Sequence, residues 1–199
     1  TLAGIIFNHR QGTLQDVSLA ANAILKGGKL SGNIRGDAKG PAILEDMTVT
    51  KDSYVENVVV GIKVKNQGTL ANIEFRGDSL KGGILAGNIS NTGDGLINDV
   101  KLGDNAHLSG GKLGGKINGN PKAPATIENV KIQAFTSLNN VILGQQVKGL
   151  DLEHVMVGPQ VIIQKPDHTD TRINYTDAEG QTSTDLTVAS FSCTVEAIE

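Results

Sequence analysis

Three glycine-rich stretches decide the fold: "GGKLSG" begins at Gly27, "GGILAG" at Gly82 and "GGKLGG" at Gly110. Glycine has no Cβ and adopts positive φ without a steric penalty, so a glycine pair favours a tight corner. A phosphate-binding loop would need one such stretch, with GxxxxGK[ST] spacing and a following helix, and the sequence has neither. The repetition instead predicts recurring corners, after each of which a leucine points inward: Leu30, Leu85 and Leu113.

The corners belong to a longer, 83-residue duplication, which pairs Leu14 with Ile97. Residues 14–65 align with residues 97–148 without a gap, and about two-fifths of the aligned positions are identical. A shorter copy begins at Leu70, and "GIIFNHRQGTL" from Gly4 resembles "GIKVKNQGTL" from Gly61. Self-similarity at a fixed offset is typical of repeat architectures.

A finer motif recurs inside the repeat: Asn or Asp, an apolar residue, any residue and a second apolar residue. It occurs as "DVSL", "DMTV", "NVVV", "NIEF", "DVKL", "NVKI" and "NVIL". Apolar residues two apart lie on one face of a strand, so each motif predicts a short strand. Two interpretations of its Asn or Asp stay open: a hydrogen bond to a neighbouring coil or an Asn ladder, and a simple turn residue at the start of the strand.

Short strands between glycine corners predict an all-β fold, a single-stranded parallel β-helix (β-solenoid) of short coils. The motif spacing of 11, 15, 27 or 30 residues suggests coils of about 14 residues and roughly 11 coils in all. No stretch has a convincing helical period, which excludes helical repeats. The repeat is already under way at the first residues, leaving no room for an N-terminal capping helix, so we expect an upstream part of a larger protein or another subunit to cover this end.

The pattern fades after Gln164, which predicts solenoid repeats over residues 1–164 and a C-terminal β-strand extension over residues 165–199. The extension has one expected short strand near Ile173 and an alternating segment, "LTVASFSCTVEAIE", from Leu186. That segment could cap its own solenoid or pair with a neighbouring subunit by strand addition. The residues expected to carry assembly lie at the two ends: Leu2, Ile5, Phe7, Leu186, Val188, Phe191, Cys193 and Val195.

The composition excludes several function classes. The net charge of −3 and the pI near 5.8 argue against a nucleic-acid partner. No apolar run approaches the ~20 residues of a membrane span. Cys193 is the single cysteine, so no intramolecular disulfide can form.

No catalytic signature emerges, and we expect neither an enzyme nor a cofactor. The four histidines, His9, His107, His154 and His168, show no close pair at metal-ligand spacing. His107 is the best candidate for an acyltransferase histidine, but no neighbouring carboxylate is arranged to orient it. Asp-rich and Asn-rich turns could hold calcium, although solvated turns explain them better. Aromatic residues make up 3% of the chain and Trp is absent, which disfavours a polysaccharide lyase or glycosidase.

At the residues "LxGGxLxGxIxG" and "PAxIEN" the chain resembles the β-solenoid repeat regions of large bacterial surface and secreted proteins. It is similar in character, though not in motif, to bactofilin and adhesin solenoids. The resemblance implies a structural or adhesive role, outside the cell or at its surface. We therefore expect a self-assembling filament, sheath or adhesin subunit that stacks end to end through its coils. Its expected partners are other copies of the chain and a surface polysaccharide. The alternative is a monomeric carbohydrate-binding or polysaccharide-degrading module.

Overall fold

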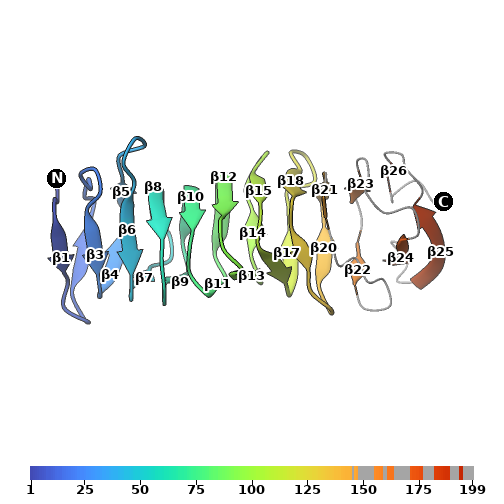
Figure 1. Ribbon diagram of the computed structural model, residues 1–199, viewed down its shortest axis with the longest axis horizontal. Helices are drawn as coiled ribbons and strands as arrows, with labels where there is room; N and C mark the ends of the chain where they lie inside the picture. Colours follow the sequence, from blue (N-terminus) through green and yellow to red (C-terminus); the bar gives the residue numbers. More distant parts are fainter. Residues whose placement is uncertain are drawn as a thin grey trace.

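The computed structural model is a parallel β-solenoid of about eight turns, in which the strands lie side by side along one long axis (Figure 1). It describes residues 1–144, 146–147, 155–158, 161–163, 171–176, 182–188 and 193–194. Within these ranges the fold is all-β and contains no helix. The predicted fold class is therefore confirmed.

A complete coil contributes three short segments, one to each of three sides. The first side contains β1 (Ile5–Phe7), β3 (Ile24–Lys26), β6 (Ala42–Glu45), β15 (His107–Ser109), β18 (Ala125–Glu128), β21 (Val141–Leu143) and β23 (Ile162–Ile163). The second contains β2 (Thr13–Gln15), β4 (Lys29–Ser31), β7 (Thr48–Val49), β9 (Lys65–Asn66), β11 (Ser79–Lys81), β13 (Leu96–Asn98), β16 (Lys112–Gly114) and β19 (Lys131–Ile132). The third contains β5 (Asn33–Arg35), β14 (Lys101–Leu102), β17 (Lys116–Asn118), β20 (Ser137–Asn139) and β22 (Met156–Val157). Three longer strands turn the corner from the third side to the first: β8 (Tyr54–Val60), β10 (Thr69–Phe75) and β12 (Ile84–Asn91).

The coils are longer than the sequence motifs predicted. Residues stacked in successive coils are 19 apart from Ile24 to Ile43, 15 apart from Tyr54 to Thr69 and 20 apart from Leu143 to Ile163. The predicted coil length and the predicted number of coils are therefore both wrong. The Asp or Asn of the motif lies at a different corner in different coils, so its spacing does not measure a turn.

The core is a set of aliphatic ladders along the solenoid axis. On the second side Leu14 stacks on Leu30, and Leu30 stacks on Val49. The three leucines predicted to follow the glycine corners are fully buried: Leu30, Leu85 and Leu113. Each ladder removes apolar surface from water, which stabilises the fold by about 25 cal/mol per Å² of buried area. This burial is the main favourable contribution to folding in a chain with few aromatic residues.

The duplication is seen in the pairing register of the strands as well as in the sequence. The pair Leu14 and Leu30 recurs in the second copy as Ile97 and Leu113. The equivalence also reaches further towards the N-terminus than residue 14, because Ile6 pairs with Leu25 as Ile89 pairs with Leu108. The bridge between Leu2 and Leu19 likewise recurs between Leu85 and Leu102. The structural counterpart of the first coil is thus the segment from residue 85.

The glycine pairs form corners, as predicted. Gly27–Gly28 and Gly110–Gly111 lie between the first and second sides, and Gly82–Gly83 lies between the second and third. Both glycines of each pair have positive φ, which is 87° at Gly110 and 68° at Gly111. A Cβ on Gly111 would overlap the amide group of Asn91 in the preceding coil, and one on Gly28 would overlap Asn8. Nδ2 of Asn91 donates a 2.7 Å hydrogen bond to the carbonyl of Gly95 and so stabilises the corner of its own coil. The glycine pair of the next coil packs directly against this asparagine. Glycine is needed here for both conformation and space.

The Asp or Asn of the strand motif also marks corners. Seven such residues have positive φ, between 50° and 58°: Asp16, Asp46, Asn57, Asn72, Asp99, Asn129 and Asn140. Three of them also accept a hydrogen bond from a backbone amide of the next coil: Asp16 from Asn33, Asn72 from Asn88 and Asp99 from Lys116. The interpretation as a turn residue is therefore confirmed at all seven corners, and the hydrogen bond to a neighbouring coil is confirmed at three of them. Asn and Asp suit this role because they tolerate the left-handed region better than other non-glycine residues.

Three further strands follow the solenoid: β24 (Thr171–Thr176), β25 (Thr182–Val188) and β26 (Cys193–Thr194). Strand β24 pairs in parallel with β22 and antiparallel with β25, and β26 pairs antiparallel with β23 of the same chain. The expected strand near Ile173 is present. Leu186, Val188 and Cys193 lie within these strands, whereas Phe191 and Val195 lie outside the described residues.

Candidate functional site

The first coil pairs with a neighbouring coil on one side only. Among the described residues β1 pairs only with β3, and β2 pairs only with β4. Four apolar residues of this coil pack against the core and are only partly buried: Leu2, Ile6, Leu14 and Val17. We call the exposed surface that they line the first-coil face. It presents apolar side chains and unpaired strand edges together, the combination that invites further strand pairing.

The duplication shows what such a face looks like when it is covered. The counterparts of Leu2, Ile6 and Leu14 are Leu85, Ile89 and Ile97, which are 0%, 2% and 0% exposed. They are covered in turn by Leu70, Ile73 and Leu80 of the preceding coil. The cover is therefore one more solenoid coil in parallel register.

Two of the residues expected to carry assembly point elsewhere. Ile5 and Phe7 lie on the outer side of β1 and are 62% and 78% exposed, whereas Leu2 is partly buried towards the core. Ile5 continues outward with Ile24 and Ile43 in the next two coils. All three residues of β1 are apolar, so the sequence pattern does not show which of them face inward, and Ile6 was not among the predicted residues.

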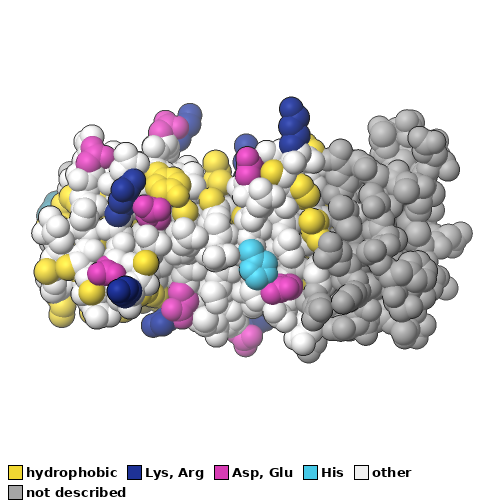
Figure 2. Space-filling model, turned by 90° about the horizontal axis from the view of Figure 1, so that it is seen from above, with side chains coloured by type: hydrophobic (Ala, Val, Ile, Leu, Met, Phe, Trp, Pro, Cys, Tyr) yellow, Lys and Arg dark blue, Asp and Glu magenta, His cyan; other side chains and the backbone are white. Residues whose placement is uncertain are grey.

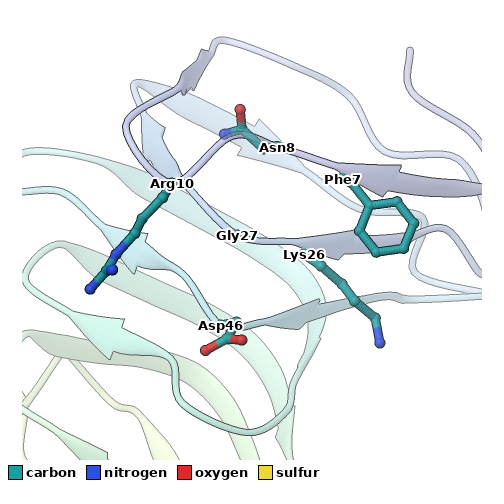
Figure 3. Close-up of a pocket in the computed structure, with 7 residues that line it drawn as sticks. Phe7, Asn8, Arg10, Lys26, Gly27 and Asp46 are labelled. Atoms are coloured by element: carbon teal, nitrogen blue, oxygen red, sulfur yellow. The ribbon is translucent and has the colours of Figure 1, made fainter.

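A hollow lies at the corner between the first and second sides of the first three coils. It has a volume of about 500 Å³ and is lined by Phe7, Asn8, Arg10, Lys26, Asp46 and the glycine pair at Gly27. Phe7 and Arg10 lie on opposite sides of Gly27, with Lys26 and Asp46 along the edge formed by the next coils (Figure 3). We call it the first corner hollow.

A second corner hollow occupies the equivalent place in the other copy. It has about half the volume, about 250 Å³, and its lining includes Gly93, Gly111 and Asn129. These three are the counterparts of Arg10, Gly28 and Asp46 in the duplication. The counterpart of Phe7 is Ser90. The first hollow thus has an aromatic ring and a guanidinium where the second copy has a serine and a glycine.

His107 has a carboxylate partner, contrary to the sequence-based expectation. Its Nε2 lies 2.9 Å from Oε1 of Glu128, which the next coil brings alongside it. The two are far apart in the sequence, so only the stacking register brings them together. Both side chains are partly exposed on the outer side of the solenoid, at 41% and 30%.

Other charged side chains are paired across or within coils. Figure 2 shows acidic and basic groups mixed on one face rather than gathered by sign. The pKa of Glu74 is lowered, chiefly because Arg76 donates hydrogen bonds of 2.6 and 2.8 Å to its carboxylate. The pKa of Asp99 is also lowered, first by the hydrogen bond from the backbone amide of Lys116 and then by Lys81. These pairs brace neighbouring segments of the surface.

The described part of the chain contains no group of three or more His, Cys, Asp and Glu side chains that could hold a metal ion. Over the same residues, no helix has the length and apolar character needed to cross a membrane.

Comparison with known proteins adds no relative. No protein-family model, no curated protein and no solved structure matches the chain. The two copies of the repeat therefore serve as references for each other.

Proposed function

We propose that the chain is a structural, self-assembling solenoid segment of an extracellular or cell-surface filament, sheath or adhesin, in which copies stack end to end. The first-coil face carries this proposal. Its apolar side chains are partly exposed, while their counterparts in the second copy are buried under another coil.

The chemistry of the face favours a coil as its occupant. The unpaired edges of β1 and β2 offer backbone groups in the spacing of a parallel strand, and their inward residues continue ladders that run through the molecule. A second copy that contributes one coil would extend these ladders by the contacts that already join coils within the chain. Solenoids propagate through such nearest-neighbour contacts.

The first experiment measures the molar mass of the purified 1–199 chain across concentration by light scattering, with negative-stain microscopy of the same samples. We expect mass to rise with concentration and the particles to lengthen along one axis. A chain that stays monomeric up to the highest soluble concentration would overturn the proposal.

A pair of variants on β2 locates the contact. Leu14→Asp places a charge on the first-coil face, whereas Gln15→Asp places it on the exposed outer side of the same strand. We expect Leu14→Asp to abolish the increase in mass and Gln15→Asp to preserve it, because a buried unpaired carboxylate is costly. Circular dichroism of both variants establishes that the solenoid is still folded. Equal assembly of the two variants would place the contact elsewhere.

A further inference from the structure

The two corner hollows are built on the same backbone, yet their linings differ. In the aligned copies Phe7 replaces Ser90, Arg10 replaces Gly93 and Lys26 replaces Ser109. The scaffold beneath is shared, since Nδ2 of Asn8 donates to the carbonyl of Gly12 as Nδ2 of Asn91 donates to that of Gly95. The added groups are therefore not needed to form the corner.

Two of the added groups, Phe7 and Arg10, are free to bind a ligand. Phe7 is 78% exposed, which is costly for an aromatic ring that only fills structure. Arg10 and Asp46 are both exposed, and neither forms an ion pair with another described residue. Lys26, by contrast, is held by Glu45 at 2.8 Å. The hollow thus offers an apolar ring face, an unpaired guanidinium and an unpaired carboxylate around one concave surface.

We infer that the first corner hollow binds a saccharide unit that carries a carboxylate, as in a uronic acid polymer. A guanidinium pairs with a carboxylate through two parallel hydrogen bonds. The Asp46 carboxylate accepts hydrogen bonds from hydroxyl groups, and the Phe7 ring covers the apolar C–H face of a sugar ring. The volume lies within the range of small-molecule sites, and the open shape lets a polymer continue past the bound unit.

This inference does not rest on end-to-end stacking. The hollow lies at a lateral corner, and its residues belong to the first three coils rather than to the first-coil face. A monomer could therefore bind the saccharide, and a stacked chain would present the hollow once in every copy along its length.

The test titrates the full 1–199 chain with a galacturonic acid oligomer and, in parallel, with a neutral cello-oligosaccharide of equal length, by calorimetry. We expect saturable binding of the acidic oligomer and at least about tenfold weaker binding of the neutral one, since one charge-assisted contact to Arg10 is lost. Affinity for the acidic oligomer should fall with rising salt, because the contact is exposed.

The residues of the second copy suggest which substitutions to test in the first. Arg10→Gly and Phe7→Ser introduce the residues that the same corner already accommodates at Gly93 and Ser90, so both are compatible with the fold. Each should weaken binding of the acidic oligomer by about tenfold. Lys112→Ala in the second corner hollow is the matched control and should leave the affinity unchanged. Equal affinity for the two oligomers, unchanged binding in Phe7→Ser, or no saturable binding of either oligomer would overturn the inference.

Discussion

The backbone amide of Lys116 donates a 3.0 Å hydrogen bond to the carboxylate of Asp99 in the preceding coil. The amide of Asn33 makes the same contact, at 2.8 Å, with Asp16 in the first copy. In each case the donor follows a glycine of positive φ, Gly115 or Gly32, on which a Cβ would overlap the carboxylate. One side chain thus joins two coils at a corner where strand pairing is interrupted.

This contact makes stability depend on pH through Asp99. The pKa of Asp99 is lowered from its ordinary value of 3.8, so its contribution is fully present above that value and is lost as the pH falls through the lower pKa of the folded state. We expect Asp99→Asn to reduce the dependence of the unfolding free energy on pH below about 4, where the wild-type side chain takes up its proton. Urea unfolding at a series of pH values measures this.

Asp94→Asn is the control for that series, because the Asp94 carboxylate is 96% exposed and accepts no hydrogen bond from a described backbone amide. It should leave the acid limb of the stability curve almost unchanged. A wild-type slope retained in Asp99→Asn would mean that other carboxylates carry the acid response.

A second prediction concerns the close approach at the glycine corners. Gly111→Ala should lower the free energy of unfolding by about 1–3 kcal/mol, because alanine is strained at a φ of 68° and its Cβ meets the Asn91 amide. In Gly93→Ala the new Cβ has no neighbour closer than 3.9 Å and the backbone is not left-handed. We expect that variant to stay within about 0.5 kcal/mol of wild type in denaturant unfolding. Similar stability of the two variants would remove the steric explanation for the paired glycines.

The β16 strand allows a direct comparison of its inward and outward positions. Leu113 is fully buried, stacks on Ile97 and is followed in the ladder by Ile132. Leu113→Ala should cost about 2–5 kcal/mol, from lost burial and from the cavity left behind. Lys112→Ala, one residue earlier on the outer side, should change stability by less than about 0.5 kcal/mol. A cost for Leu113→Ala as small as that of Lys112→Ala would contradict the ladder assignment.

The sequence predicted the corners and the inward residues because both depend on local chemistry. A glycine pair such as Gly110 and Gly111 needs no partner to indicate a turn, and Val100 and Leu102 reveal their common face by a period of two. The predicted coil length was wrong for a physical reason: Asp and Asn residues with left-handed backbone conformation occur at more than one corner of the coil. The step from Asp46 to Asn57 covers only part of a coil, whereas the longer step from Asn57 to Asn72 covers a full turn.

The candidate sites were harder to predict, because they depend on register between coils. Glu128 lies one full coil after His107 in the sequence, and nothing local links them until β18 stacks on β15. Arg10 and Asp46 likewise come from different coils. One signal was available in the sequence: extending the alignment of the two copies to residue 1 places Phe7 and Arg10 opposite Ser90 and Gly93, the substitutions that distinguish the two hollows.

The last prediction uses the duplication to measure what covers the first coil. Leu14 and Ile97 are equivalent ladder residues, but Leu14 is partly buried and Ile97 is 0% exposed. At low protein concentration Ile97→Ala should cost about 2–5 kcal/mol and Leu14→Ala less, since a partly exposed side chain loses less burial. If copies stack through the first-coil face, Leu14 becomes as buried as Ile97 in the assembly.

The cost of Leu14→Ala should then rise with protein concentration while that of Ile97→Ala stays constant. Association of folded chains also makes the thermal midpoint increase with concentration, which thermal unfolding over a wide dilution series detects. A difference between Leu14→Ala and Ile97→Ala that is the same at every concentration would show that no second copy covers the face. A Leu14→Ala cost that already equals that of Ile97→Ala in the most dilute sample would show that the face is covered within a single chain. Either result would refute end-to-end stacking through the first coil, because that contact alone makes the burial of Leu14 depend on the number of copies present.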